Sequence, residues 1–345
     1  MSEIKVNSIS SLNGANGPVI SGIATMVSSG AMLLPRGDTA YRGGRGRGVF
    51  GGGADAPSTV GMNIIDYITI ATLGNALDFG DLNTISSYSA PVSSSTRGVF
   101  AGGVGTPSSP YRVNSISYIT ISATGNSFDF GDLTTIRYTS GSCSNSTRGI
   151  VAGGDSPTVL KSIDYITIAT LGNASNFGDL TVETEEFSGC SSPIRGIFGG
   201  GANPGVTYTN VIEYVTISTL GDAQDFGDLT QSKRVMGSSS SPTRAIFFGG
   251  NTGSGVNTIE YVTIASLGDG IDFGDLITAT RNNTSCSSSI RGISAGGGLS
   301  PSSPAYSDSI EYVTIATLGN AADFGNLTDA RSGLKGLSDS HGGLG

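Results

Sequence analysis

Paired aspartates are the first residues in this chain whose type and spacing could do chemistry. The motif Asp-Phe-Gly-Asp places two carboxylates three residues apart, as at Asp78 and Asp81, and two further copies carry Asn176 or Asn326 in place of one Asp. Two carboxylates near a turn could hold Ca²⁺, which takes roughly six to eight oxygen ligands. The structural alternative is that one Asp caps a hairpin and the other pairs with an arginine. Since Asn also serves that role, we expect no metal site.

Few other side chains suit catalysis. His341 is the single histidine, and no Gly-x-Ser-x-Gly nucleophile motif accompanies it. Cys143, Cys190 and Cys286 each lie five residues before a repeated arginine, so they occupy equivalent places in separate repeats and form no zinc-type cluster. We expect small buried cysteines, no cofactor and no enzymatic activity.

These residues belong to a block that recurs six times, about every 50 residues. In its first copy it reads Arg-Gly-Val-Phe-Gly-Gly-Gly (47–53) and then Ile-Asp-Tyr-Ile-Thr-Ile-Ala-Thr-Leu-Gly-Asn-Ala-Leu-Asp-Phe-Gly-Asp-Leu (65–82). Its arginine and tyrosine are Arg47, Arg97, Arg148, Arg195, Arg244 and Arg291, and Tyr67, Tyr118, Tyr165, Tyr214, Tyr261 and Tyr312. We interpret both as structural residues of the repeat.

Each copy predicts four strands: a short apolar strand ending in glycines, a tyrosine strand, a phenylalanine strand and a strand of small residues. The Gly-Asn pair between the second and third predicts a primed hairpin turn. Four short antiparallel strands in a repeat of this length are typical of a propeller blade. The six arginines could form an anion-binding ring, but a buried ion pair with the acid before each tyrosine is favoured, because unpaired buried charge is costly. The sequence predicts an all-β, six-bladed β-propeller with four-stranded antiparallel blades.

The two ends of the chain have different expected roles. Residues 1–43 lack the repeat and are interpreted as an N-terminal arm for attachment, and the basic stretch 36–47 as a solvated loop or a contact for an acidic partner. The propeller is expected to span 44–345. The step from Arg331 to His341 equals that from Arg281 to Arg291, so 332–341 should be the small-residue strand that completes the blade begun at Arg47. The competing closure uses residues 37–46.

Composition limits the partners. The 345 residues include 54 glycines and carry a formal net charge of −9, which argues against nucleic acid as a partner. There is no run of 18 apolar residues for a membrane span and no secretory signal at the start of the sequence.

Binding is expected in the segments that differ between copies, which follow the paired glycines. Alternating strands place all six on one face: 54–63, 104–114, 155–161, 202–211, 251–257 and 299–308. Exposed tyrosines beside Pro and Ser suit sugar or protein recognition. The candidates are Tyr111 with Arg112, Tyr208, and Tyr306.

The repeats resemble known families. Paired glycines after a short strand, followed by a tyrosine and a later aromatic, are similar to kelch repeats, with Phe where kelch usually has Trp. Closer is the resemblance of Tyr-Ile-Thr-Ile-Ala-Thr-x-Gly-Asn-Ala-x-Asp-Phe-Gly-Asp-Leu, preceded by Ser-Ser-Thr-Arg-Gly-Val-Phe, to virion structural proteins of marine T4-like tailed phages, notably cyanophages. Segments 21–39 and 338–345 are similar too.

That resemblance implies a virion component, a tail, fibre or appendage protein made in the host cytoplasm. Its arm would bind other virion proteins, and its loops would attach to a host surface glycan or protein. The alternative is a glycan-binding or carbohydrate-active propeller that acts on host surface polysaccharide.

Overall fold

The computed structural model describes residues 46–55, 61–105, 111–300 and 305–344, and assigns three short strands before them. The chain divides into two compact units, 1–45 and 46–345. In the first, β1 (Val19–Ile20), β2 (Ala24–Met26) and β3 (Met32–Leu33) form one antiparallel sheet. The predicted arm, 1–43, and most of the basic stretch 36–47 fall in this unit and lie outside the described residues.

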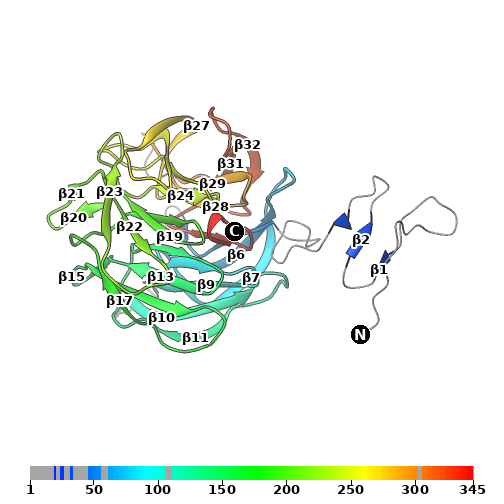
Figure 1. Ribbon diagram of the computed structural model, residues 1–345, viewed down its shortest axis with the longest axis horizontal. Coiled ribbons are helices and arrows are strands. Elements are labelled where there is room, and N and C mark those ends of the chain that lie inside the picture. Colours follow the sequence, from blue (N-terminus) through cyan, green and yellow to red (C-terminus); the bar gives the residue numbers. More distant parts are fainter. Residues whose placement is uncertain are drawn as a thin grey trace. The chain divides into compact units, whose positions relative to one another are not determined.

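The second unit is a six-bladed β-propeller of mostly four-stranded antiparallel sheets (Figure 1). From the axis outward the blades are β34 (Lys335–Ser338), β4 (Arg47–Gly51), β6 (Met62–Thr69), β7 (Leu77–Ser86); β8 (Ala90–Ser93), β9 (Arg97–Val104), β10 (Arg112–Thr120), β11 (Phe128–Asp132); β12 (Gly141–Ser144), β13 (Arg148–Ala152), β16 (Ser162–Thr167), β17 (Ser175–Asp179); β18 (Ser188–Ser191), β19 (Arg195–Gly199), β22 (Val211–Thr216), β23 (Gln224–Asp228); β24 (Gly237–Ser240), β25 (Arg244–Phe248), β26 (Val256–Thr263), β27 (Ile271–Arg281); and β28 (Thr284–Ser287), β29 (Arg291–Ala295), β31 (Ser309–Thr314), β32 (Ala322–Asn326).

Short elements decorate the blades. Seven short strands lie in or beside the variable loops, and η1 lies near the axis: β5 (Ala54–Asp55) with β33 (Arg331–Ser332), β14 (Asp155–Ser156) with β15 (Thr158–Val159), β20 (Ala202–Asn203) with β21 (Thr207–Tyr208), β30 (Gly298–Leu299) beside β27, and η1 (Gly342–Leu344).

The hydrophobic core lies between blades. One cluster joins Phe50 and Ile68 of the first blade to Ile293 and Phe324 of the sixth, all of them buried. Each blade has apolar groups on both faces, so it buries them only against two neighbours. A single copy of the repeat therefore has no core of its own.

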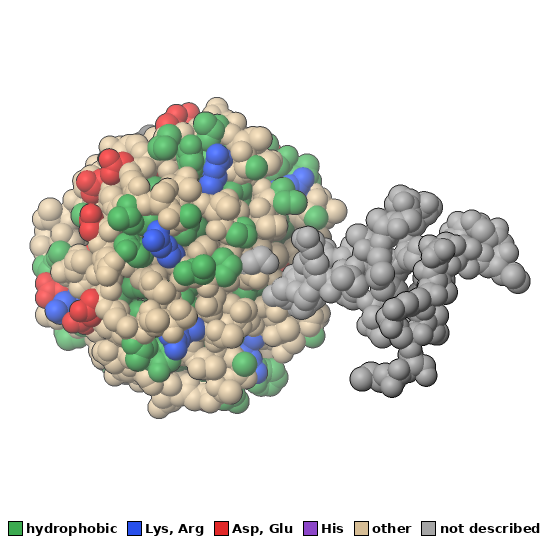
Figure 2. All heavy atoms as spheres, viewed as in Figure 1, with side chains coloured by type: hydrophobic (Ala, Val, Ile, Leu, Met, Phe, Trp, Pro, Cys, Tyr) green, Lys and Arg blue, Asp and Glu red, His purple; other side chains and the backbone are tan. Residues whose placement is uncertain are grey.

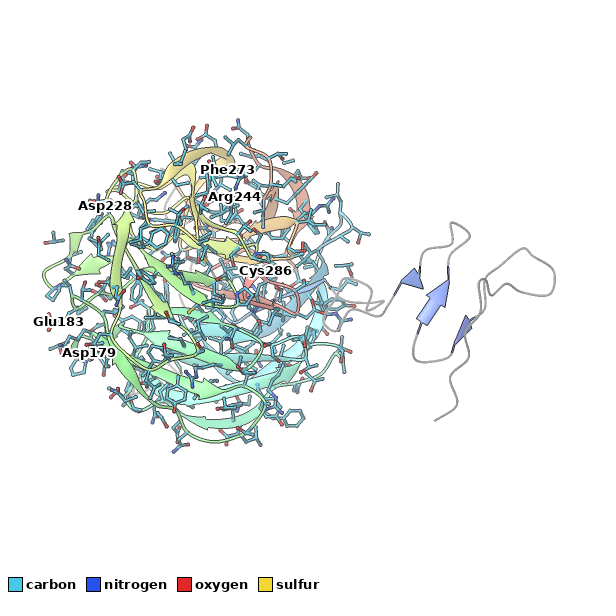
Figure 3. The ribbon with its side chains drawn as sticks, viewed as in Figure 1. Asp179, Glu183, Asp228, Arg244, Phe273 and Cys286 are labelled. Carbon is cyan, nitrogen blue, oxygen red and sulfur yellow. The ribbon has the colours of Figure 1, made fainter. Side chains whose placement is uncertain are left out.

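The cysteines fill this space near the axis. All three are free and buried, as the sequence predicts. A Cβ built on Gly196 would lie 2.3 Å from Cys143 Sγ, and one on Gly48 would lie 2.6 Å from Cys286 Sγ. The glycine of each Arg-Gly pair thus makes room for a side chain of the preceding blade. Cys286 lies near the centre of the propeller, whereas Asp179 and Asp228 lie at its periphery (Figure 3).

The first blade is assembled from both ends of the repeat array. β34 pairs antiparallel with β4, with Leu337 opposite Val49 and Ser338 opposite Gly48. This strand lies within the segment 332–341, and it occupies the inner edge of β4 that the competing closure through residues 37–46 would need. The sheet so formed joins the last strand of the array to the first.

The predicted primed hairpin turn between the tyrosine and phenylalanine strands is wrong. β6 ends at Thr69 and β7 begins at Leu77, so seven residues separate them. The loop is long because it leaves its own blade and bonds to a neighbour, as described below.

We predict that removing residues 332–345 unfolds the propeller or lowers its thermal midpoint strongly. The deletion exposes the inner edge of β4 and removes the buried Leu334 and Leu337, each worth about 2–5 kcal/mol by comparison with Leu→Ala changes. Thermal denaturation followed by circular dichroism measures the loss. Removing only 341–345, which leaves β34 in place, serves as the control and should cost much less. Equal midpoints for the two deletions would contradict the closure.

Candidate functional site

The Asp-Phe-Gly-Asp motif serves as a docking point for the next blade. Gly125 N donates to Phe79 O at 2.7 Å, and Ser127 N donates to Asp81 O at 2.8 Å. Asp81 N in turn donates to Asn126 Oδ1 at 3.0 Å. These three hydrogen bonds, which we call the blade latch, satisfy backbone groups at the outer edge of the sheet that would otherwise be unpaired.

The latch repeats at every junction and closes on itself. The backbone N–H of the motif's last residue donates to the accepting side chain of the adjacent loop at 2.9–3.1 Å. The accepting residues are Asn75, Asn126, Asn173, Asp222, Asp269 and Asn320. Because Asn and Asp present the same Oδ1 acceptor, both types occur there.

The structural interpretation of the motif aspartates needs correction. The hydrogen-bonding role belongs to the main chain of the motif and to the adjacent Asn or Asp, and no motif aspartate pairs with a repeat arginine among the described residues. Asp179 instead pairs with Lys161 at 3.1 Å on the surface. No group of three or more His, Cys, Asp or Glu that could hold a metal lies within the described part of the chain.

The repeat arginines stack on the repeat tyrosines. The guanidinium carbon of Arg47 lies 4.4 Å from the ring centroid of Tyr67, and Tyr67 meets Phe79 edge to face at 6.0 Å. Arg47 Nη1 also donates to Ile121 O of the second blade at 2.7 Å. Each guanidinium therefore combines a cation–π contact with a bond across the blade junction.

The same arrangement recurs around the propeller. The bonds to the next blade span 2.7–3.0 Å and join Arg97 to Ile168, Arg148 to Ile217, Arg195 to Ile264, Arg244 to Ile315, and Arg291 to Ile70. The predicted ion pair between each arginine and the acid before the tyrosine is wrong, because that acid points into the seam between blades. Figure 2 shows a face of the propeller on which Lys and Arg side chains lie among hydrophobic ones.

The acids before the tyrosines bond to the preceding blade. Asp66 accepts from Thr328 Oγ1 at 2.8 Å and pairs with the buried Arg331 at 2.6 Å. Glu260 accepts from Thr230 N at 2.7 Å and pairs with Lys233 at 2.6 Å. Asp164 is held likewise by Thr134 and Arg137.

The other three seams lack a cation among the described residues. Ser117 donates to Asn83 at 2.8 Å, Glu311 accepts from Ile277 N at 2.8 Å, and Glu213 accepts from Thr181 N at 3.1 Å. Burial raises the pKa of the Glu213 and Glu311 carboxyls. In alternate blades, one position in this connection carries the cation that pairs with the acid. In the Glu213 seam the residue at that position is Thr184, which borders a cavity of about 50 Å³.

Two closed rings of hydrogen bonds surround the axis. Six serines, one at the end of each innermost strand, donate their Oγ to the carbonyl of a neighbouring member at 2.5–2.9 Å. They are Ser93, Ser144, Ser191, Ser240, Ser287 and Ser338. Small residues are needed there because six strands converge.

The six innermost strands enclose a channel along the axis, and His341 lies at one end of this channel. Gly343 N donates to His341 Nδ1 at 3.1 Å, so the proton of the neutral ring resides on Nε2, which lies 3.1 Å from Ser93 O. Burial lowers the pKa of His341 to about 4. The imidazole is therefore a neutral structural group at neutral pH, as the sequence suggests.

The second ring forms the opposite mouth of the channel. Each of its members donates its backbone N–H to the carbonyl of a neighbour at 2.7–3.1 Å, and each has φ between 51° and 68°. They are Tyr88, Thr139, Glu186, Val235, Asn282 and Gly333, which we call the mouth ring. Positive φ is costly for β-branched Thr and Val, and the closed hydrogen-bond ring holds them there.

The predicted loop residues are spread over three blades. Tyr111 is exposed, with 57% of its surface accessible. Arg112 pairs with Asp155 at 2.9 Å and stacks on Tyr138 at 4.5 Å. Tyr208 lies under Arg234 at 4.7 Å, and Tyr306 is half-buried. Among the described residues, no hydrogen bond, ion pair or ring contact joins the three groups, so they form separate points on the loop face and no single site.

Sequence reasoning missed several residues. Tyr138, Arg234 and Glu186 contact the predicted candidates or each other, but they lie in the connections between blades. Asp155 begins the variable loop 155–161 and was not singled out there. Lys335, which lines the channel, was also missed. The sequence does show that Lys335 departs from the repeat, because the five equivalent positions carry small residues.

Gly80→Ala and Gly74→Ala separate a steric clash from backbone strain in the latch. Both glycines have positive φ, 140° and 150°, so each change costs about 1–3 kcal/mol in conformational strain. A Cβ on Gly80 would also lie 2.6 Å from the carbonyl of Gly125, whereas nothing lies within 4 Å of one on Gly74. Chemical denaturation should show Gly80→Ala as clearly the more destabilising. Equal losses would show that the latch tolerates displacement.

Glu213→Gln should stabilise the propeller near neutral pH. The pKa of the Glu213 carboxyl is higher in the folded than in the unfolded state. The stabilising contribution of the protonated carboxyl is therefore fully present below the ordinary glutamate pKa, and it is lost as the pH rises through the pKa of the folded state. A neutral amide avoids the loss, so the gain should vanish at about pH 4, where the wild-type carboxyl is itself protonated. Unfolding free energies at both pH values test this.

Glu260→Gln is the matched control. Here the change leaves the buried Lys233 without its partner and should cost about 3 kcal/mol at neutral pH. Stabilisation by Glu260→Gln, or destabilisation by Glu213→Gln, would contradict the distinction between the two seams.

Comparison with known proteins adds no family. No protein-family description matches the chain, and no curated protein matches it at a significant level. Among the residues that the structure describes, no helix is long and apolar enough to cross a membrane. The structure establishes a six-bladed β-propeller fold, and these comparisons assign no family to the chain.

Proposed function

We propose that the protein is a non-enzymatic structural component of a phage virion, a tail, fibre or surface-appendage propeller that attaches through its variable loops. One observation carries the proposal: the repeated polar residues bond blade to blade, while the described parts of the segments that differ between blades follow the glycine end of each blade and so lie on one face. A scaffold with a variable face suits recognition. The resemblance of the repeats to virion proteins of marine tailed phages supports the setting.

The face opposite the loops suits attachment to the virion. Gly46, where the propeller begins, lies on this side and donates its N–H to Asp339 at 2.9 Å. The latch loops add large apolar side chains to the same face, each 57–58% exposed: Leu73, Leu171, Leu220, Leu267 and Leu318. In the proposal, residues 1–43 bind other virion proteins, and the variable loops bind the host surface.

A second candidate is a propeller that binds or cleaves host surface polysaccharide. The exposed Tyr111 beside Arg112 favours it, because an aromatic ring next to a charged donor suits a sugar. A glycan array and a turnover assay on host envelope polysaccharide distinguish the candidates. Release of oligosaccharide would replace the structural proposal with an enzymatic one.

Deleting residues 1–35 should abolish incorporation into particles and leave the propeller folded. Immunogold labelling of particles measures incorporation, and circular dichroism of the purified chain measures the fold. Normal incorporation of the deleted chain would contradict the role of the arm.

Tyr111→Ala should weaken adsorption of particles to host cells by about tenfold, which corresponds to about 1.4 kcal/mol. The control is Phe128→Ala, which removes an exposed aromatic side chain from the outer strand β11. Equal effects of the two changes would remove the loop face as the attachment surface.

A further inference from the structure

Lys335 breaks the sixfold pattern inside the channel. It is the first residue of the innermost strand β34. The residues at this place in the other five blades are small and uncharged: Ala90, Gly141, Ser188, Gly237 and Thr284. The first blade therefore carries an ammonium group where the repeat has none.

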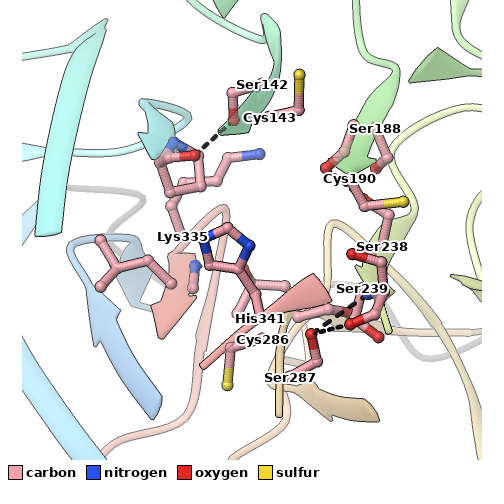
Figure 4. Close-up of a pocket in the computed structure, with 18 of the residues that line it drawn as sticks. Ser142, Cys143, Ser188, Cys190, Ser238, Ser239, Cys286, Ser287, Lys335 and His341 are labelled. Carbon is pink, nitrogen blue, oxygen red and sulfur yellow. Dashed lines mark hydrogen bonds between the residues drawn. The ribbon is translucent and has the colours of Figure 1, made fainter. Parts of the chain in front are cut away.

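The space beside Lys335 is a cavity of about 90 Å³ on the axis. Figure 4 shows its lining of innermost strands, with Lys335 and His341 among the residues drawn. No Asp or Glu is among the residues that line it. Lys335 also borders a smaller cavity of about 20 Å³ next to the mouth ring, so it lies between the channel and the loop face.

The amine of Lys335 has no hydrogen-bond or ion-pair partner among the residues that the structure describes. The acid whose charge acts on it is Glu186, which is already paired with Arg234. Burial lowers the pKa of Lys335 to about 8, so the group still carries charge at neutral pH. Lys335 is half-buried, and an ammonium that is partly removed from water without a hydrogen-bonded counter-ion is costly.

Three further side-chain atoms that line the same cavity lack a hydrogen-bond partner among the described residues: Ser239 Oγ, Ser285 Oγ and the acceptor Asn283 Oδ1. Ser285 is 7% exposed, and its Oγ has no hydrogen-bond partner among the described residues. The equivalent hydroxyls of Ser142 and Ser238 donate to carbonyls of the neighbouring blade at 2.7 and 2.9 Å. Ser285 thus supplies a free donor to the cavity that holds the ammonium.

We propose that the axial channel binds a small anion, a halide or a single carboxylate group, against the ammonium of Lys335. A cavity of about 90 Å³ has room for several water molecules, which is enough for a chloride ion or a carboxylate. The Ser285 hydroxyl is a further donor to the anion. This site lies inside the propeller and is independent of the proposed role in attachment.

Lys335→Thr tests the site, and the chain supplies evidence that it should fold, because Thr284 occupies the same place in the sixth blade. The thermal midpoint is measured against sodium chloride and, separately, against sodium acetate. Wild type should gain about 2–4 °C more than Lys335→Thr as the anion saturates the site. The matched control is Lys161→Thr, which removes an exposed positive charge and should respond to salt as wild type does.

The two salts identify the ligand. A gain with chloride alone assigns the site to a free halide, and a gain with both salts admits a carboxylate. Parallel responses of wild type and Lys335→Thr in both salts would overturn the proposal.

The pH dependence gives a further check. The excess gain of wild type should shrink between about pH 7 and about pH 10, as the ammonium loses its proton. The pKa of both Tyr88 and Cys286 is raised by burial, and neither carries a positive charge in either form. The other titratable groups that line the cavities beside Lys335 are Cys143, Cys190, the neutral His341 and Glu186, which is paired with Arg234.

Crystals soaked in bromide provide a measurement that needs no variant. An anomalous peak beside Lys335 Nζ is expected, and its absence at full soaking would overturn the halide form of the proposal.

Discussion

The blade latch is the interaction on which the rest of this structure depends. A four-stranded blade leaves unpaired backbone groups along its outer strand, and such an edge invites aggregation. Here the neighbouring loop donates two N–H groups to carbonyls of that edge and accepts a third with an Asn or Asp side chain. The same hydrogen bonds thus pair the backbone groups of the outer strand and fix the position of the next blade. The glycine of Asp-Phe-Gly-Asp leaves room for the loop to come close.

Because the latch, the Arg–Tyr stack and the axial serines close on themselves, the repeated polar residues are committed to the scaffold. Their bonds link one blade to the next, so each blade depends on its neighbours for hydrogen bonds as well as for its hydrophobic core. This explains why residues that could have served catalysis or metal binding recur so regularly. It also locates function in whatever departs from the repeat.

The departures are of two kinds. Among the described residues, seams between blades that contain a cation alternate with seams that lack one. In one seam Lys233 neutralises Glu260, whereas in the adjacent seam Glu213 faces a small cavity. On the axis, Lys335 faces a channel of serines and glycines. In both places the departure leaves a charged group without an ion pair among the described residues, and partial burial makes such a charge either a liability or a binding site.

The sequence by itself determined the six repeats, their four strands, the register of the cysteines and the match between segment 332–341 and the other small-residue strands, because these follow from periodicity and residue size. It misassigned the hairpin turn and the arginine partners, and it missed Lys335 as a channel residue. Those features depend on contacts between blades, which join residues such as Arg291 and Ile70 that lie far apart in the chain. Local patterning fixes what each strand buries, whereas the choice of partner for a polar group is decided only when neighbouring blades meet.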